Sequence, residues 1–322
     1  MSLMLRKLSI IAAISFLASM QWVTEAATKK SAKPPSSSIV TSPRRDIISQ
    51  NPYLGAIVVD AASGRVLFED HADAKGYPAS VLKLMDLLII LEKIESKQLS
   101  LKDQVPVSAK ASRTGGSQVY LAEKESFTVE DMLYALMVQS ANDAAVALSE
   151  KVAGSTDGFV ELMNKRARGL GMTSTVFHSV HGLPPSAGQE HDVTTARDFS
   201  LLCRELVLKH PRALRYTSTR ERAFRPGAKT VTMRTHNHLL GHVEGVDGLK
   251  TGYITAAGYS IAITAARNGQ RIIVMVLDSV DRPTRDKHAA QLVAKGFAAL
   301  GGAPLSSQTS APVQKASSAK AR

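Results

Sequence analysis

The strongest constraint on the fold of this chain is a pair of apolar runs joined by the dipeptide Asn268-Gly269. Residues 260–266 and 271–277 are largely apolar, and Asn-Gly between two such runs favours the tight turn of a β-hairpin. A second hairpin is predicted near the other end of the sequence, where residues 55–59 and 65–68 flank a short turn-forming segment. The folded region is therefore expected to begin and end with paired strands.

Between the two hairpins, the apolar residues repeat at helical spacing. Residues 128–131 have the pattern of a capping box that opens a helix, and residues 144–152 and 195–208 carry further helical repeats. Strands at both ends with helices between them predict an α+β fold. In such a fold, an antiparallel sheet made of the N- and C-terminal segments packs with helices, and a helical subdomain is inserted into it.

The first 26 residues are predicted to be a secretory signal peptide. Arg6 and Lys7 precede an apolar stretch, residues 8–23, and small residues follow at Ala26 and Ala27. The stretch is shorter than the ~20 residues that span a bilayer, which disfavours a retained anchor. The protein is therefore expected to be secreted across the cytoplasmic membrane, into the periplasm or the cell-wall compartment.

The segments on either side of the predicted folded region are rich in Ser, Pro and Lys. Such a composition buries too little apolar surface to offset the entropy of ordering. Residues 27–50 are therefore predicted to be a linker, and residues 301–322 a disordered tail. Residues 51–300 remain as one folded domain, and the 44% hydrophobic content of the chain is sufficient for its core.

The net charge of +12 is concentrated in residues 1–45 and 303–322. The folded region is close to neutral and lacks the excess of basic residues that binding to a phosphate backbone requires. Nucleic acid is therefore not an expected partner. The basic ends are expected to give a weak electrostatic association with the membrane or the cell wall.

Cys203 is the only cysteine in the sequence. An intramolecular disulfide is therefore excluded. The apolar helical context of residues 199–203 predicts a small buried core residue and not a nucleophile.

The first candidate for chemistry is Ser80, three residues before Lys83. Pro78 is well placed to begin a helix, and residues three apart in its first turn lie on one face. A serine hydroxyl needs a base, and a lysine can be that base if burial and a second cation lower its pKa from ~10.4 towards 7 or 8. The spacing alone is not specific, because residues 317–320 repeat it in the predicted tail.

Two further motifs lie downstream. Ser140-Ala141-Asn142 falls at the junction of two predicted helices, where a hydroxyl and an amide can relay a proton and hold a substrate amide. Lys250-Thr251-Gly252 precedes the second hairpin on a predicted edge strand. Lys250 is the candidate second cation, Thr251 can hydrogen-bond a carboxylate, and Gly252 allows a substrate backbone to approach closely.

In this order, the three motifs resemble the set found in penicillin-binding proteins and serine β-lactamases. Additional runs narrow the resemblance to the D-alanyl-D-alanine carboxypeptidases of low molecular mass. These runs are residues 115–118, 140–145, 181–183, 195–198 and 246–252. The resemblance implies a β-lactamase/transpeptidase-like fold, with residues 51–300 as the catalytic domain.

The resemblance also implies a role for each motif residue. Ser80 would be the acylated nucleophile and Lys83 its general base. Ser140 and Asn142 would relay a proton and orient the substrate.

The substrate carboxylate would face the motif on the edge strand. Lys250 and Thr251 would bind it, together with Arg282 or, alternatively, Arg285. The backbone N–H groups of Ser80 and Tyr253 would form the oxyanion hole.

The implied activity is that of a serine D-Ala-D-Ala carboxypeptidase. It would act on peptidoglycan stem peptides through a Ser80 acyl-enzyme, without a metal or an organic cofactor, and β-lactam antibiotics would inhibit it covalently. The alternative is a D-alanyl-D-alanine endopeptidase that cuts peptidoglycan cross-links, because the layout without a second, all-β domain is similar to those enzymes. Residues 246–252 and Ala141 favour the carboxypeptidase.

Other classes of protein are less well supported. A zinc hydrolase is disfavoured because the histidines lack a His-Glu-x-x-His motif and are expected to be surface or loop residues. These histidines are His178, His181, His191, His236 and His238. A Ser-His-Asp hydrolase would carry a Gly-x-Ser-x-Gly elbow, and none occurs.

Two other classes of protein would share part of the implied site. A β-lactamase is disfavoured because residues 161–164 (Glu-Leu-Met-Asn) do not match the Glu-x-x-Leu-Asn run associated with its hydrolytic water. A non-catalytic wall-binding protein is disfavoured by the intact Ser80, Lys83 and Lys250.

Overall fold

The computed structural model describes residues 47–301, apart from residues 226, 228 and 229. The predicted signal peptide, the linker up to residue 46 and the tail from residue 302 lie outside the described residues, so these predictions remain untested. Within the described part, none of the helices combines the length and the apolar character that crossing a membrane requires.

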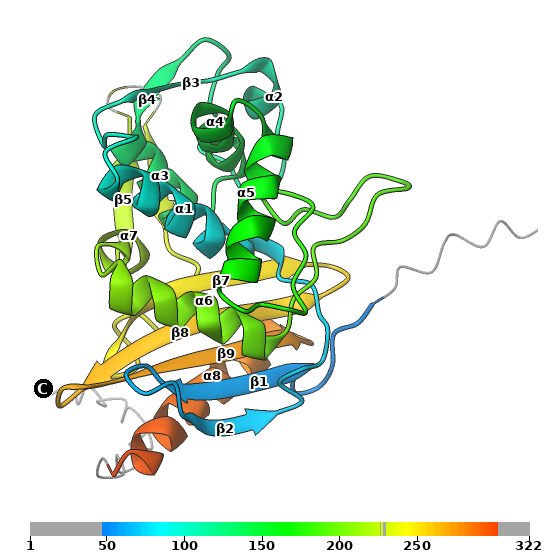
Figure 1. Ribbon diagram of the computed structural model, residues 1–322, viewed down its shortest axis with the longest axis vertical. Helices are drawn as coiled ribbons and strands as arrows, with labels where there is room; N and C mark the ends of the chain where they lie inside the picture. Colours follow the sequence, from blue (N-terminus) through cyan, green and yellow to red (C-terminus); the bar gives the residue numbers. More distant parts are fainter. Residues whose placement is uncertain (1–46, 226, 228–229, 302–322) are drawn as a thin grey trace, which may run out of the picture. The chain divides into compact units, whose positions relative to one another are not determined.

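A five-stranded antiparallel sheet joins the two ends of the folded region. Its strand order is β2-β1-β9-β8-β7, so the first strand pairs with the last (Figure 1). The strands are β1 (Gly55–Asp60), β2 (Val66–Asp70), β7 (Val246–Ile254), β8 (Gly258–Arg267) and β9 (Gln270–Ser279). Both predicted hairpins and the predicted α+β class are confirmed.

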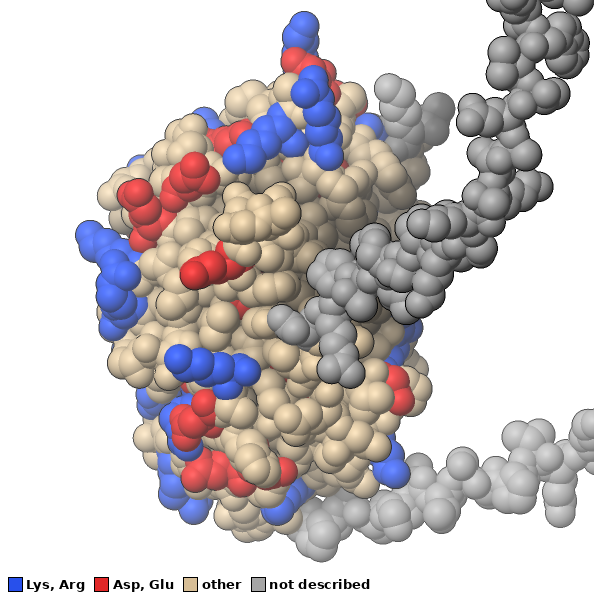
Figure 2. Space-filling view, turned by 90° about the vertical axis from the view of Figure 1, so that its right-hand side faces the viewer, with Lys and Arg blue, Asp and Glu red and all other residues tan. Residues whose placement is uncertain are grey.

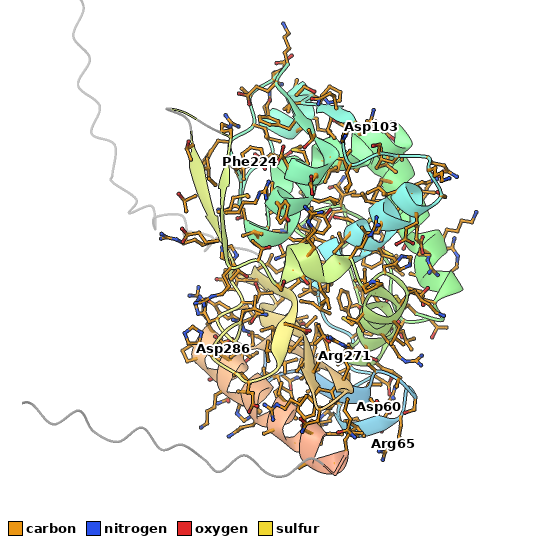
Figure 3. All side chains as sticks on the ribbon, turned by 90° about the vertical axis from the view of Figure 1, so that its left-hand side faces the viewer. Asp60, Arg65, Asp103, Phe224, Arg271 and Asp286 are labelled. Atoms are coloured by element: carbon orange, nitrogen blue, oxygen red, sulfur yellow. The ribbon has the colours of Figure 1, made fainter. Side chains whose placement is uncertain are left out.

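The tight turns of the sheet follow from local sequence. Asn268 and Gly269 have φ angles of 49° and 77°, the left-handed pair that a two-residue hairpin turn requires. In the other hairpin, the Asp60 carboxylate accepts the backbone N–H of Ala62, and Asp60 N–H donates to the carbonyl oxygen of Arg65 (Figure 3). Each turn therefore sets the register of its two strands.

The sheet is covered on both faces. Ile57 packs in the core that lies against α6 (Ala196–Lys209), whereas its neighbour Val58 packs in a second core that includes residues of α8 (Arg282–Ala299). Successive residues of a strand point to opposite faces, so this alternation places one helix on each side (Figure 1). The central strands β1, β8 and β9 are consequently apolar and buried over most of their length.

A helical subdomain lies beyond the edge strand β7 and α6 (Figure 1). Its helices are the 3₁₀ turn η1 (Ala79–Leu82), α1 (Lys83–Glu95), α2 (Ala109–Ser112), α3 (Val129–Val138), α4 (Asn142–Ala153), α5 (Thr156–Gly169) and α7 (Ala213–Thr217). Two small antiparallel sheets complete it, β3 (Gln104–Pro106) with β4 (Ser126–Thr128) and β5 (Glu221–Phe224) with β6 (Val231–Arg234). Every residue of α1 from Lys83 to Leu91 is buried, so this helix is the centre of the subdomain.

The helix boundaries agree with the capping signals. Thr128 Oγ1 accepts the backbone N–H of Asp131 at the start of α3, and Thr195 Oγ1 accepts that of Asp198 at the start of α6. Cys203 is fully buried in α6, and burial raises the pKa of its thiol. The prediction that it is a core residue is confirmed.

Charged side chains of both signs are interspersed on the surface. Figure 2 shows such a face, with basic and acidic groups lying side by side. Ion pairs join several charged side chains of the protein, as in the bidentate contact of Arg271 with the Asp247 carboxylate at 2.8 and 2.9 Å. The view agrees with the near-neutral balance expected for the folded region.

Gly296 tests the packing of α8 on the sheet. A Cβ atom at Gly296 would lie 2.8 Å from Val58 Cγ1 and 2.9 Å from Ile272 Cδ1, so Gly296→Ala forces overpacking that typically costs about 1–3 kcal/mol. Because helix propensity returns up to about 1 kcal/mol, we expect a net loss of about 1–2 kcal/mol. Thermal unfolding should show a Tm lowered by about 2–4 °C per kcal/mol.

The matched control is Gly169→Ala at the end of α5. A Cβ atom there would meet nothing closer than Arg166 Nη1 at 3.8 Å, so its Tm should be unchanged or higher. Equal effects of the two substitutions would contradict the packing argument.

Candidate active site

Ser80 lies in a turn with a strained backbone, directly before the first residue of α1. Pro78 caps η1, and Ala79 has a φ of 47°, an unusual value for a residue with a Cβ atom. The predicted helix start at Pro78 is right in position, but its first turn is a 3₁₀ turn and α1 itself begins at Lys83. Ser80 therefore sits on a separate turn, with its hydroxyl directed at the first residue of α1.

Lys83 is fully buried, and its amine contacts three separate segments. Nζ lies 2.9 Å from Ser80 Oγ, 2.8 Å from Asn142 Oδ1 and 2.7 Å from the carbonyl oxygen of His181. Burial lowers the pKa of Lys83 to about 7, while neighbouring carboxylates raise it in part. A free amine is therefore available near neutral pH, within hydrogen-bond distance of a hydroxyl.

Burial, and not a second cation, is the largest cause of this lowered pKa. The sequence predicted Lys250 as that cation. Lys250 is itself buried, and its own pKa is lowered well below the ordinary range by burial first and then by the charges of Lys83 and Arg285. Lys250 is not among the groups that shift the pKa of Lys83, whereas the charge of Lys83 does lower the pKa of Lys250.

Ser140 and Asn142 lie on the short connection between α3 and α4, as predicted. Ser140 has a φ of 60° and is 3% exposed, and its Oγ has no hydrogen-bond partner within the described residues. Asn142 is fixed on both sides, because its Nδ2 donates to the carbonyl oxygen of Gly115 at 2.8 Å while its Oδ1 accepts from Lys83. In this connection, the Asn142 amide therefore has hydrogen-bond partners on both sides, whereas the Ser140 hydroxyl has none within the described residues.

The edge strand β7 lies directly against the turn that carries Ser80. A Cβ atom at Gly252 would lie 2.6 Å from the carbonyl oxygen of Pro78 and 3.1 Å from the backbone nitrogen of Ser80. Glycine is therefore required here by the chain's own backbone. The prediction assigned this close approach to a substrate, and the structure adds the contact with η1 as a physical reason.

A cavity of about 380 Å³ opens between these segments. It is lined by Ser80, Gly116, Ser117, Ser140, Asn142, Gly182, Leu183, His236, Thr251, Gly252, Tyr253, Tyr259, Arg282 and Arg285. Lys83 and Lys250 are buried, and their amines contact the lining residues Ser80 and Thr251. The structure therefore brings together all the residues that were predicted from the three motifs.

Both candidate arginines come from the start of α8. Arg285 is 2% exposed, and its guanidinium donates to Asp286 Oδ1 at 2.6 and 2.9 Å. Burial lowers the pKa of Arg285. Arg282 is exposed and makes no ion pair within the described residues, so its guanidinium is the one available to a ligand.

Two histidines lie at or beside the site, and His181 is in one of the runs that narrowed the resemblance (residues 181–183). His236 lines the cavity, and loss of solvent around its ring together with the charge of Lys250 lowers its pKa to about 4. His181 has its pKa lowered to about 4, by burial first and then by Lys83. Both residues lie in loops, as predicted. The place of His236 in the cavity lining was not predicted, because no local motif links it to the three motifs.

The histidines do not form a metal centre in the described part of the chain. The one group there with three suitable ligand atoms is Glu92, Glu205 and His210. Arg166 donates to both carboxylates, at 2.7 and 2.6 Å, so their charge is already compensated. Glu161, considered for a β-lactamase water, is exposed on α5 and does not line the cavity.

Comparison with known proteins agrees with the motifs. Residues 41–281 match the family model described as D-alanyl-D-alanine carboxypeptidase. The chain is 32% identical over 251 residues to D-alanyl-D-alanine carboxypeptidase DacF of Bacillus subtilis, which covers 78% of this chain and 63% of DacF. It therefore spans less than two thirds of that relative.

Two other similarities bear on the site. The chain is 29% identical over 243 residues to a D-alanyl-D-alanine endopeptidase of Pseudomonas aeruginosa, covering 74% of each protein. Its fold is similar to that of penicillin-binding protein D2 of Listeria monocytogenes, solved with ampicillin bound, with a TM-score of 0.68, 34% identity, and coverage of 76% of this chain and 96% of the other. The transpeptidase-like fold is thereby confirmed.

The titration of Lys83 tests the electrostatics of the site. We expect its side-chain NMR resonances to titrate near pH 7, with Lys83→Met identifying them by their loss. Asn142→Leu removes an acceptor that stabilises the ammonium form, so the pKa of Lys83 should fall further. A value near 10, or an unchanged pKa in Asn142→Leu, would contradict this description.

Proposed function

We propose that this chain, which belongs to the D-alanyl-D-alanine carboxypeptidase family, removes the terminal D-alanine from peptidoglycan stem peptides by serine acyl-enzyme chemistry. The observation that carries the proposal is the contact of 2.9 Å between Ser80 Oγ and the buried amine of Lys83 at the cavity. Nucleophile and base within hydrogen-bond distance are the minimum for such a reaction.

Acylation begins with transfer of the Ser80 proton to Lys83. With a pKa of about 7, a large fraction of Lys83 is a neutral amine at neutral pH. This amine is still basic enough to accept the proton of Ser80. Ser80 Oγ then attacks the carbonyl carbon of the D-Ala-D-Ala peptide bond. The backbone N–H groups of Ser80 and Tyr253 are proposed to stabilise the oxyanion.

Breakdown of the tetrahedral intermediate requires a proton on the leaving nitrogen. Ser140 is proposed to pass this proton from Lys83 to the departing D-alanine, and its Oγ has no competing partner within the described residues. Asn142 holds the amine of Lys83 and orients the substrate amide. Water then hydrolyses the Ser80 ester and releases the shortened peptide.

The carboxylate of the terminal D-alanine is proposed to bind at the β7 side of the cavity. Thr251 and Arg282 line this part, and a carboxylate bound there would favour the ammonium form of the buried Lys250, whose pKa is lowered in its absence. Arg282 is preferred over Arg285, because the guanidinium of Arg285 is already paired with Asp286. A carboxylate there would place the preceding peptide bond at Ser80.

A D-alanyl-D-alanine endopeptidase is the second candidate. The observation that favours it is the Pseudomonas aeruginosa relative, of which this chain covers 74%, against 63% of DacF. The acylation chemistry would be the same, but the leaving group would be the cross-linked amine and not free D-alanine. A cleavage assay is needed to separate the two activities.

β-Lactam antibiotics are proposed as covalent inhibitors that acylate Ser80. Penicillin-binding protein D2 was solved with ampicillin and with cefotaxime bound, and this chain is 34% identical to it. Because the substrate polymer lies outside the cytoplasm, the periplasm or the cell-wall compartment is the proposed location. The predicted signal peptide supports this location.

Labelling with a fluorescent penicillin tests the acylation chemistry. Ser80→Ala should abolish the label, and Lys83→Ala should slow labelling by about 10²–10⁴-fold, the usual contribution of a general base. Lys151→Ala, an exposed lysine on α4, is the control and should label at the rate of the unmodified protein. Normal labelling of Lys83→Ala would overturn the proposed mechanism.

Digestion of muropeptides tests the choice between the two activities. The unmodified protein and Ser80→Ala are incubated with monomeric pentapeptides and cross-linked dimers, and the products are measured by mass spectrometry. Loss of one alanine from the pentapeptides, absent with Ser80→Ala, is the expected result. Conversion of dimers to monomers with pentapeptides unchanged would assign the chain to the endopeptidases.

A further inference from the structure

A fully buried carboxyl group contacts the segment that leads to Ser80. It belongs to Asp278, the second-last residue of β9. Its Oδ2 accepts the backbone N–H of Tyr77 at 3.0 Å, across 201 positions of sequence. Tyr77 leads through Pro78 into η1, so this hydrogen bond joins the core of the sheet to the chain three residues before Ser80.

The other carboxyl oxygen of Asp278 is held by β8. Ser260 Oγ donates to Asp278 Oδ1 at 3.0 Å and accepts the backbone N–H of Asp278, also at 3.0 Å. Ser260 is paired with Gly252 of β7, the glycine that lies against η1. One carboxyl group therefore links the segment that enters η1 to the strand that supports the edge of the sheet.

The backbone of β9 is irregular at this point. Between Tyr259 and Ile261, β8 advances by two residues, whereas β9 advances by three, from Ser279 to Val276. One extra residue in a strand is a β-bulge. Within it, Asp278 has a φ of 56°, which is uncommon for a residue with a Cβ atom.

The bulge changes the direction of the Asp278 side chain. Successive residues of a regular strand point to opposite faces, but Leu277 and Asp278 both face Gly76. A Cβ atom at Gly76 would collide with Asp278 Oδ2 and would lie 2.7 Å from Leu277 Cδ2. Bulges beside functional sites can re-aim a side chain, and here the residue with the strained backbone is the one whose carboxyl group reaches Tyr77.

We propose that Asp278 is a positioning residue for acylation, which holds the turn with Ser80 against β7 by accepting the backbone N–H of Tyr77. The spacing between the two proposed oxyanion-hole donors, the N–H groups of Ser80 and Tyr253, then depends on this hydrogen bond. The inference rests on the proposed function, because it concerns that oxyanion hole. Asp278 is not part of the cavity lining in the described residues, so it acts through Tyr77.

The contact between η1 and β7 explains why the turn needs such a restraint. The Cβ position of Gly252 lies 2.6 Å from the carbonyl oxygen of Pro78, so the turn can relax only by moving away from the strand. The φ of 47° at Ala79 makes the turn unfavourable by itself. A displacement of about 1 Å at a reacting centre can cost about 10²-fold in rate.

The restraint does not require a negative charge on Asp278. Burial raises the pKa of Asp278 to about 7, whereas the hydrogen bonds from Tyr77 and Ser260 lower it in part. A protonated carboxyl group keeps its carbonyl oxygen as an acceptor for the Tyr77 N–H and can donate its proton to Ser260 Oγ. Asparagine offers the same acceptor and a donor, and it tolerates a positive φ.

The test is the kinetics of penicillin acylation over a range of penicillin concentrations, which separates the acylation rate constant from the affinity of the initial complex. Asp278→Gly removes the acceptor and adopts a positive φ without strain. We expect its acylation rate constant to fall about 10²-fold, with the affinity changed by less than about threefold. Asp278→Asn retains the acceptor and should acylate at least about tenfold faster than Asp278→Gly.

Asp60→Gly is the matched control. It makes the same change at another carboxylate of the same sheet that accepts backbone N–H groups, and Asp60 does not line the described cavity. Its acylation rate constant should stay within about threefold of that of the unmodified protein. A lowered Tm in Asp278→Gly with an unchanged acylation rate constant would mean a merely structural role and would overturn the proposal. Equal rate constants in Asp278→Gly and Asp278→Asn would overturn it as well.

Amide hydrogen exchange keeps the two proposals separable. If the unmodified protein is not acylated at all, the proposed function fails, whereas exchange at Tyr77 and Val81 still decides the present inference. The Val81 N–H donates to the carbonyl oxygen of Pro78 at 3.2 Å and closes the turn. Both amides should exchange at least about tenfold faster in Asp278→Gly than in the unmodified protein and in Asp278→Asn. Unchanged exchange at Val81 would refute the inference.

Gly76→Ala tests the same contact from the other side, should Asp278→Gly not fold. The added Cβ atom would collide with Asp278 Oδ2 and push the neighbouring Tyr77 away from its acceptor. The same loss in the acylation rate constant and the same faster exchange at Val81 are expected. Normal values of both would contradict the positioning role.

Discussion

Burial of the Lys83 amine is the constraint on which the rest of the site depends. An ammonium group in a helix interior is unfavourable unless its donors are satisfied, and here three acceptors from three separate segments surround it. The turn with Ser80, the connection with Asn142 and the loop with His181 are therefore held at fixed distances by one side chain. The same burial lowers the pKa of the amine to about 7, so the group that organises the site also becomes a base.

The edge strand β7 of the five-stranded sheet forms the second half of the site. Strand β7 has a neighbouring strand on one side only, and its other side meets η1 at Gly252 so closely that a Cβ atom would collide with the Pro78 carbonyl oxygen. Because β7 pairs with β8, and β8 with β9, this edge is anchored in the core between α6 and α8. A rigid edge beside a strained turn keeps the Ser80 backbone N–H near the strand, as the proposed oxyanion hole requires.

The sequence was informative wherever a signal is local. The Asn268-Gly269 turn, the Thr128 and Thr195 caps and the burial of Cys203 were predictable, because each depends on residues close in the chain. The place of His236 in the cavity lining and the burial of Arg285 were not. They arise from contacts between segments far apart in the sequence. The same is true of the lowered pKa of Lys83, for which the sequence suggested a second cation and the structure gives desolvation as the main cause.

The sequence alone therefore determined the fold class, the family and the three motifs, since these depend on periodicity, turn chemistry and residue spacing. Only the tertiary structure decided that Lys83 and Asp86 are both buried in α1, that Gly252 is needed by the protein's own backbone, and that Arg285 is buried while Arg282 is exposed. The physical reason is that burial and pairing depend on which distant segments exclude water from a side chain. No stretch of sequence carries that information by itself.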